Sequence, residues 1–69
     1  MITDAHIAAI IDAGFTARKH APSGRTYLKY DGKDAGYITD ADADGGTGTC
    51  SNVTRRAGSV AAALRSVST

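Results

Sequence analysis

Two adjacent arginines, Arg55 and Arg56, are the first candidates for chemistry, because the sequence places them in the first turns of a predicted helix. The positive end of a helix dipole disfavours a cation by about 0.3–1 kcal/mol, so arginines at this position indicate a functional need. Cations beside the free N–H groups of a helix start form an anion site, and phosphate is the usual anion. The alternative is that Asp40, Asp42 and Asp44 neutralise the arginines within the same molecule.

The acidic segment 40–51 offers a second kind of chemistry. Asp40, Asp42 and Asp44, followed by Gly45, resemble the D-x-D-x-D-G start of EF-hand calcium loops. Calcium needs hard oxygen ligands at alternate positions and a glycine for the sharp turn. Position twelve of such a loop is Ser51 here, where the family has a bidentate glutamate. The open alternatives are a calcium site on the three aspartates and a solvated acidic loop.

Three tyrosines, Tyr27, Tyr30 and Tyr37, fall on one predicted hairpin and could stack with bases. One face of the hairpin must pack on the helices, so at least one tyrosine is expected in the core. An exposed tyrosine beside Lys29 or Arg25 would equally suit a protein-binding hot spot.

Catalytic chemistry has little support in the sequence. His6 and His20 lack the spacing of metal ligands, and the single cysteine, Cys50, has no evident base and cannot form an internal disulfide. The glycine-rich segment 45–48 lacks the lysine of a phosphate-binding loop. We therefore expect a protein that is not an enzyme and that has no cofactor.

Hydrophobic periodicity and turn residues divide the chain into two helices and three strands. The expected elements are a helix over 4–13, strands over 15–20, 25–30 and 33–39, and a helix over 52–67. Thr3 is predicted to cap the first helix, and Gly14 to end it in the left-handed conformation. The second helix carries the apolar stripe Val53, Ala57, Val60, Leu64 and Val67. Residues 40–49 contain no large apolar side chain and are expected to form a loop.

The Asp31-Gly32 dipeptide predicts a tight antiparallel turn between the last two strands. A two-residue loop pairs Lys29 with Asp34, Leu28 with Ala35 and Thr26 with Tyr37. A three-residue loop would shift this register by one residue. We prefer the first register, because it sets opposite charges across from each other. It places Tyr30 and Tyr37 on one face of the sheet and Tyr27 on the other.

Length, composition and charge limit the class of protein. The 69 residues carry eight Lys/Arg, seven Asp/Glu and a formal charge of +1, which excludes a multidomain enzyme and a highly basic tail. Cations gather in 16–33 and 52–69 and acids in 34–51, so the surface either compensates locally or forms a dipole that steers a charged partner. No leader pattern or long apolar run is visible, and we expect one soluble cytoplasmic domain over 1–69, away from membranes.

The predicted fold is α+β, in the order αβββα, with a three-stranded antiparallel sheet and both helices packed on one face. This order resembles the double-stranded-RNA-binding domain over nearly the whole chain. The residues that stand roughly where that family has a glycine-rich approach and a basic helix start are Gly46, Gly48, Thr54, Arg55, Arg56, Gly58, Ser59, Ala62 and Ala63. In the family this helix start grips phosphates, which the resemblance implies for Arg55 and Arg56. A nucleic-acid binder would also use Arg25 and Lys29.

In size and composition the chain is also similar to small accessory proteins of phages and mobile elements, such as anti-CRISPR and other host-defence inhibitors. This resemblance implies a monomer or homodimer that occludes a larger host protein or nucleoprotein. The aspartates Asp40, Asp42 and Asp44 would engage a basic surface, and the hairpin residues Tyr27, Lys29 and Tyr30 would anchor the complex. Such an inhibitor is the leading hypothesis, and the nucleic-acid binder and the calcium-stabilised module are the alternatives.

Overall fold

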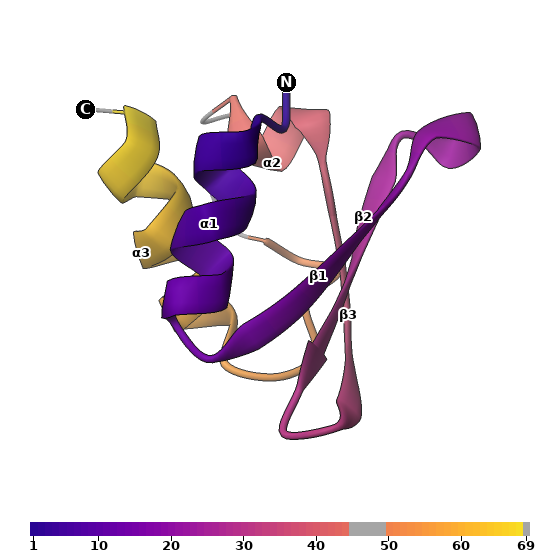
Figure 1. Cartoon of the computed structure of the whole chain (residues 1–69), viewed down its shortest axis with the longest axis vertical. Coiled ribbons are helices and arrows are strands. Elements are labelled where there is room, and N and C mark those ends of the chain that lie inside the picture. The colour runs from indigo at the N-terminus through magenta and orange to yellow at the C-terminus, as the bar shows by residue number, and fades with distance from the viewer. Residues whose placement is uncertain (45–49, 69) are drawn as a thin grey trace.

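Two helices lie on one side of a three-stranded antiparallel sheet in the computed structural model, which describes residues 1–44 and 50–68 (Figure 1). The elements are α1 (Asp4–Asp12), β1 (Phe15–His20), β2 (Arg25–Tyr30), β3 (Lys33–Thr39), the single turn α2 (Asp40–Ala43) and α3 (Ala57–Ser68). A 3-10 turn, Ala21–Ser23, joins β1 to β2. The order αβββα and the α+β class are therefore as the sequence predicts.

Helix α1 begins and ends where its capping residues require. The His6 N–H donates to the Thr3 hydroxyl (3.4 Å), and the Thr3 N–H donates to Nδ1 of His6 (3.0 Å), which together form a capping box. Gly14 follows the helix at φ +99°, in the region that glycine adopts without a steric penalty. Phe15 then turns into the core, so the predicted caps of this helix are confirmed.

A β-bulge in β3 changes the predicted register halfway along the hairpin. Lys29 lies opposite Asp34, as predicted, but Leu28 lies opposite Gly36, which leaves Ala35 as the extra residue. The predicted pairs of Leu28 with Ala35 and of Thr26 with Tyr37 are therefore wrong. The bulge turns both Ala35 and Ile38 into the core, although an unbroken strand would send them to opposite faces. Burying the Ile38 side chain stabilises by about 1.5–3 kcal/mol, which exceeds the typical loss of one ladder hydrogen bond, about 0.5–1.5 kcal/mol.

The chain segment 52–54 docks along the outer edge of β3 at the bulge. The Tyr37 N–H donates to the Asn52 carbonyl (3.2 Å), and the Thr54 N–H donates to the Ala35 carbonyl (2.9 Å). Gly36, at φ +90°, lies so close to Asn52 that a β-carbon there would collide with the Asn52 backbone. The edge of β3 is thereby covered by backbone from a distant part of the chain.

Two predicted element boundaries are wrong, each because of hydrogen bonds to the backbone that the prediction did not include. The second helix begins at Ala57 and not at residue 52, because the backbone of 52–54 is bonded to β3. Arg55 and Arg56 therefore precede α3 and do not lie in its first turns. Within the predicted loop 40–49, residues Asp40–Ala43 form α2, whose start is capped by Thr39 and Asp42. Residues 45–49 lie outside the described residues.

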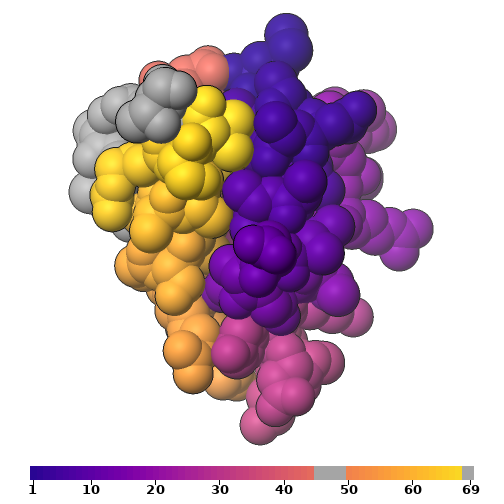
Figure 2. All heavy atoms as spheres, turned by 60° about the vertical axis from the view of Figure 1, so that its left-hand side comes forward, coloured from indigo at the N-terminus to yellow at the C-terminus, as the bar shows by residue number. Residues whose placement is uncertain are grey.

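The core lies between the sheet and the helices. Its buried members are Ile2, Ile10, Phe15, Leu28, Ala35, Ile38, Ala43, Cys50, Val53, Val60 and Leu64. Val53, Val60 and Leu64 of the predicted apolar stripe are buried, and Ala57 packs against the cluster. Figure 2 shows α1 and α3 side by side, so that together they cover one face of the molecule. Among the described residues, no helix is long and apolar enough to cross a bilayer.

Gly36→Ala tests the docking of segment 52–54, with Gly32→Ala as the matched control. Both glycines have a positive φ, but a β-carbon at Gly32 would meet no atom within 4 Å. We expect Gly32→Ala to lower the free energy of unfolding by about 1–2 kcal/mol, the cost of the left-handed conformation alone. Gly36→Ala should cost at least about 3 kcal/mol, because strain and a backbone collision add. Equal losses in urea denaturation would contradict the docking.

Cys50 is a buried thiol beside two charged side chains. Burial raises the pKa of the Cys50 thiol, the negative charge of Asp42 raises it further, and Arg65 opposes both effects. The folded protein therefore disfavours the thiolate. The unfolded chain ionises first as the pH rises, so stability that is fully present below the ordinary pKa of 9.0 is lost above it.

Cys50→Ala isolates this alkaline effect. Above about pH 9 we expect the wild-type protein to lose unfolding free energy faster than Cys50→Ala, by up to ~1.4 kcal/mol per pH unit until the folded thiol also ionises. Urea denaturation at several values between pH 7 and pH 11 measures the unfolding free energy of both proteins. Lysine and tyrosine titrate in both, so their effect cancels in the difference. Parallel pH profiles would show that the thiol is as accessible to water as in the unfolded chain.

Candidate functional site

The face of the sheet that points away from α1 and α3 carries a row of aromatic side chains. Tyr27 lies between His20 and Tyr37, with ring centroids 5.9 Å apart on each side, so the three rings span all three strands. The Arg25 guanidinium carbon lies 4.4 Å from the centroid of the Tyr37 ring. We call these four side chains the aromatic row. The register explains the row, because Tyr27 pairs directly with Tyr37 once the bulge has shifted β3.

Two further cations, Arg18 and Lys29, flank the aromatic row on the same face. Arg18 pairs with Tyr27 and Lys29 pairs with Thr16, and both cations are exposed, as Arg25 is. Within 1–44 and 50–68, none of them has a carboxylate within the 4.0 Å of an ion pair. We call the whole surface the open face; its residues are Thr16, Arg18, His20, Arg25, Tyr27, Lys29, Asp34, Tyr37 and Thr39.

A shallow hollow of about 290 Å³ lies on the open face, lined by Thr16, Ala17, Arg18, Tyr27 and Lys29. Tyr27 is 40% exposed, and its ring gives this hollow a large apolar surface. Its ring is held by edge contacts with two other rings and so is positioned before any ligand arrives. The arrangement offers a planar ring between two cations, which suits a flat, negatively charged or electron-rich partner.

The four residues predicted for nucleic-acid binding fall into two groups. Arg25 and Lys29 lie on the open face. Arg55 and Arg56 lie beside the turn that joins β2 to β3, which we call the hairpin end. There they line a second hollow with Tyr30 and Lys33. The groups meet at Asp34, which lies opposite Lys29 and whose carbonyl accepts from Nε of Arg55 (3.1 Å).

Tyr30 does not join Tyr27 on the open face. Its ring packs at 4.8 Å from the Phe15 ring on the helix side of the sheet, and Arg56 lies 4.8 Å above it. The prediction that Tyr30 shares a face with Tyr37 is therefore wrong, because the bulge moves Tyr37 to the other side. Tyr30 remains half-exposed at the edge of the hairpin.

The three aspartates predicted to bind calcium or a protein each have a separate partner within the chain. Asp40 accepts from the Ile2 N–H (3.0 Å), and Asp42 accepts from the N–H (2.9 Å) and hydroxyl (3.2 Å) of Thr39. Asp44 pairs with the Met1 amino group. Among the described residues, no three or more His, Cys, Asp or Glu side chains are placed to hold a metal ion. The structure does not assemble the predicted ligand set, because each of the three carboxylates is engaged by a different group of the chain.

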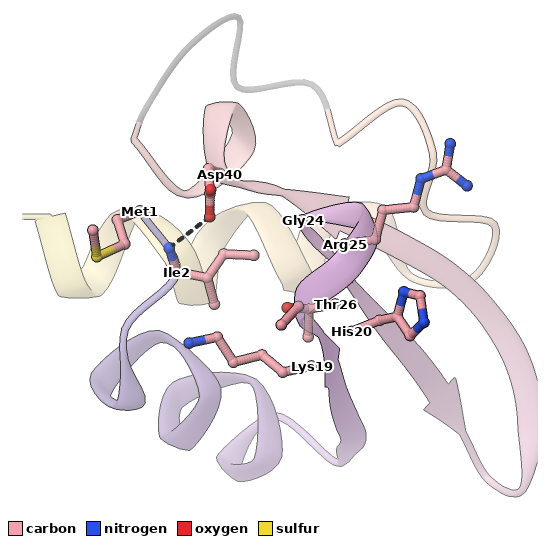
Figure 3. Close-up of a pocket in the computed structure, with 9 residues that line it drawn as sticks. Met1, Ile2, Lys19, His20, Gly24, Arg25, Thr26 and Asp40 are labelled. Atoms are coloured by element: carbon pink, nitrogen blue, oxygen red, sulfur yellow. Dashed lines mark hydrogen bonds between the residues drawn. The ribbon is translucent and has the colours of Figure 1, made fainter.

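A smaller hollow, of about 160 Å³, lies at the other end of the sheet. Figure 3 shows Ile2 bonded to Asp40 on one side of it and Thr26 and Lys19 on the other, while Arg25 points away. The Thr26 hydroxyl is buried without a hydrogen-bond partner among the described residues. The charged side chains of its lining are Lys19, Arg25 and Asp40, and the Asp40 carboxylate already accepts from the Ile2 N–H.

Sequence reasoning did not select Arg18 and His20, and it named Tyr37 as a possible stacking ring but placed it on the same face as Tyr30 rather than Tyr27. A signal for the first two was present, because their alternation in β1 matches that of Arg25 and Tyr27 in β2. The signal for Tyr37 was the spacing of Asp34 and Gly36, since the Gly36 N–H donates to the Asp34 carboxylate (3.0 Å) inside the bulge. An Asp two residues before a Gly within a strand indicates such a break.

Comparisons with protein-family models, with curated proteins and with solved structures found no match to this chain.

Asp42→Ala tests whether this carboxylate serves as a helix cap or as a metal ligand. Removing the bonds to Thr39 should lower the free energy of unfolding by about 1 kcal/mol. Asp12→Ala is the control, because Asp12 lies at the C-terminal end of α1, where the helix dipole gives an acid no stabilisation. We expect melting temperatures in millimolar Ca²⁺ and Mg²⁺ to agree. A rise specific to Ca²⁺ that Asp42→Ala abolishes would restore the calcium hypothesis.

Proposed function

We propose that the protein binds single-stranded nucleic acid on the open face. The observation that carries the proposal is the aromatic row, which crosses three strands and is flanked by Arg18 and Lys29. Neither cation has a carboxylate partner in the part of the chain that the structure describes. Surfaces that combine stacking rings with a positively charged path are typical of proteins that bind single strands. The binding mode needs no cofactor and no chemical step.

Each part of the open face has a distinct role in this proposal. Tyr27 is the most exposed of the three tyrosines and stacks with a base, while His20 and Tyr37 hold it in place. Arg18, Arg25 and Lys29 attract the phosphates on either side. Arg25 already lies over the Tyr37 ring, so part of the entropy of ordering this long side chain is lost before binding.

A single strand suits this surface better than a duplex. The faces of paired bases are covered by their neighbours in the stack, so an aromatic ring on a sheet has nothing to stack on except at a helix end. In a single strand the bases can splay out and reach the ring. The only carboxylate on the open face is that of Asp34, which lies at one edge and accepts from the Gly36 N–H.

Occlusion of a protein or nucleoprotein, as by host-defence inhibitors, is the second candidate function. Tyrosine and arginine concentrate binding energy at protein interfaces, and Tyr27 is exposed with Arg18 across from it. The exposed carboxylates Asp40 and Asp44 supply negative charge on α2 for a basic partner. In this case the open face would contact protein, and the acidic residues would contribute to affinity.

Tyr27→Ala tests the first proposal. We expect the affinity for a short fluorescent oligothymidylate to fall about 5- to 150-fold, since stacking on one ring contributes about 1–3 kcal/mol. Tyr27→Phe keeps the ring and should retain most of the affinity. Arg65→Ala, on α3, removes a cation from the helical face and should leave the affinity nearly unchanged. Fluorescence anisotropy at low salt measures all four proteins.

The outcome that contradicts nucleic-acid binding is an affinity that Tyr27→Ala leaves unchanged, or no binding at low salt. Charge reversal separates the two candidate functions. Asp40→Lys and Asp44→Lys should strengthen binding to a nucleic acid, because they remove repulsion, but should weaken binding to a basic protein surface. A capture from lysate that is insensitive to nuclease and lost in these variants would favour occlusion.

A further inference from the structure

The hollow at the hairpin end brings three cationic side chains together on one concave surface. It measures about 400 Å³ and is lined by Tyr30, Asp31, Lys33, Thr54, Arg55 and Arg56. Three cations and one carboxylate leave two positive charges in excess. Within residues 1–44 and 50–68, none of the three cations has a carboxylate within the 4.0 Å of an ion pair.

Arg55 is held in place by the edge of the sheet. Its Nε donates to the Asp34 carbonyl (3.1 Å), and this bond fixes the plane of the guanidinium group. The two terminal NH₂ groups are left to donate to a ligand. A guanidinium anchored in this way can present its donors to two oxygens of one anion, and it loses little further entropy on binding.

Arg56 is held by a different contact on the other wall of the hollow. Its guanidinium carbon lies 4.8 Å from the centroid of the Tyr30 ring, and that ring packs in turn on Phe15. Contact with the face of the ring leaves the N–H groups at the edge of the guanidinium available to a ligand. The two arginines are therefore placed by the protein before any anion binds, and Lys33 adds a third, flexible donor.

We propose that the hairpin-end hollow binds the terminal phosphate of a single strand that lies on the open face; this rests on the proposed function. A terminal phosphate monoester carries nearly two negative charges at neutral pH, whereas each internal phosphodiester carries one. The excess of two positive charges in the hollow matches the monoester. Its three terminal oxygens can accept from Arg55, Arg56 and Lys33 together.

The hollow and the open face adjoin at the paired ends of β2 and β3, because Tyr30 and Lys33 of the hollow are the chain neighbours of Lys29 and Asp34. Lys29 lies opposite Asp34 on the open face, and Asp34 bonds to Arg55 in the hollow. A strand whose bases stack on the aromatic row would therefore run along Lys29 and end at the arginines. This placement predicts a preference for a phosphorylated end, which a surface that binds only internal phosphates would not have.

The test compares three forms of one short oligothymidylate: with a 5′-phosphate, with a 3′-phosphate and with no terminal phosphate. We expect one phosphorylated form to bind the wild-type protein about tenfold or more tightly than the unphosphorylated form, as charge-assisted bonds to a single group would provide. Arg55→Gln and Arg56→Gln should remove that preference while changing the affinity for the unphosphorylated strand less than about threefold. Arg65→Gln is the charge-matched control and should retain the preference.

The outcomes separate this proposal from the one it rests on. Tyr27→Ala should weaken all three forms by the same factor and keep the preference, whereas the arginine variants should remove the preference alone. Equal binding of the three forms by the wild-type protein, or a preference that survives in both arginine variants, would overturn the phosphate site while leaving the open face in place.

Inorganic phosphate tests the hollow without any nucleic acid. We expect the NMR signals of the Arg55 and Arg56 Nε–H groups to shift on titration with phosphate and to saturate at millimolar concentrations, while the Arg65 signal does not follow them. If no strand binds the open face, a saturable shift still supports the anion site. Shifts that are linear in phosphate and equal at all three arginines would overturn it.

Discussion

The contact between Gly36 and the backbone of residues 52–54 determines the arrangement of both surfaces. The absence of a side chain at Gly36 allows the Asn52 carbonyl and the Thr54 N–H to reach the edge of β3, where they bond to Tyr37 and Ala35. This contact occupies the edge of the sheet and delays the start of α3 until Ala57. Arg55 and Arg56 are thereby set at the hairpin end, and not along the side of a helix.

The bulge beside Gly36 sorts the side chains of β3 between core and solvent. It sends Ala35 and Ile38 inward together, and it turns Tyr37 outward beside Tyr27. The burial of Ile38 stabilises the bulge, and the bulge in turn places Tyr37 beside Tyr27 in the aromatic row. The hydrogen bond from the Gly36 N–H to the Asp34 carboxylate holds the bulge and engages the only acid on the open face. One local irregularity thus supports the core and prepares a surface for binding.

Much of the fold follows from local signals in the sequence. The cap at Thr3, the glycine at position 14 and the alternation in the three strands are short-range features, and the elements they predict match the structure. The pairing of Lys29 with Asp34 also follows, because the Asp31-Gly32 turn fixes it locally. Helix α2 could have been found from Thr39 and Asp42, which have the three-residue spacing of a capping box.

The late start of α3 and the directions that the bulge gives to the side chains of β3 could not be predicted in this way. The periodicity of Val53 with Ala57 and Val60 fits a helix, and only the distant edge of β3 diverts this backbone into a bridge. The bulge decides which face of the sheet Tyr37 occupies, so the aromatic row could not be predicted from the sequence either. The candidate residues Tyr27, Lys29 and Arg25 are exposed in the structure, but their neighbours Arg18 and His20 were not among the predicted candidates.

Mapping the bound strand on the protein by NMR tests the central claim most directly. A titration of the isotopically labelled protein with an oligothymidylate should shift the amide signals of Arg18, Tyr27 and Tyr37 along one saturable curve. The signals of exposed residues on α1 and α3, such as Ala8 and Ala62, should stay in place. Shifts confined to the helical face, or spread without saturation over the whole molecule, would contradict binding on the open face.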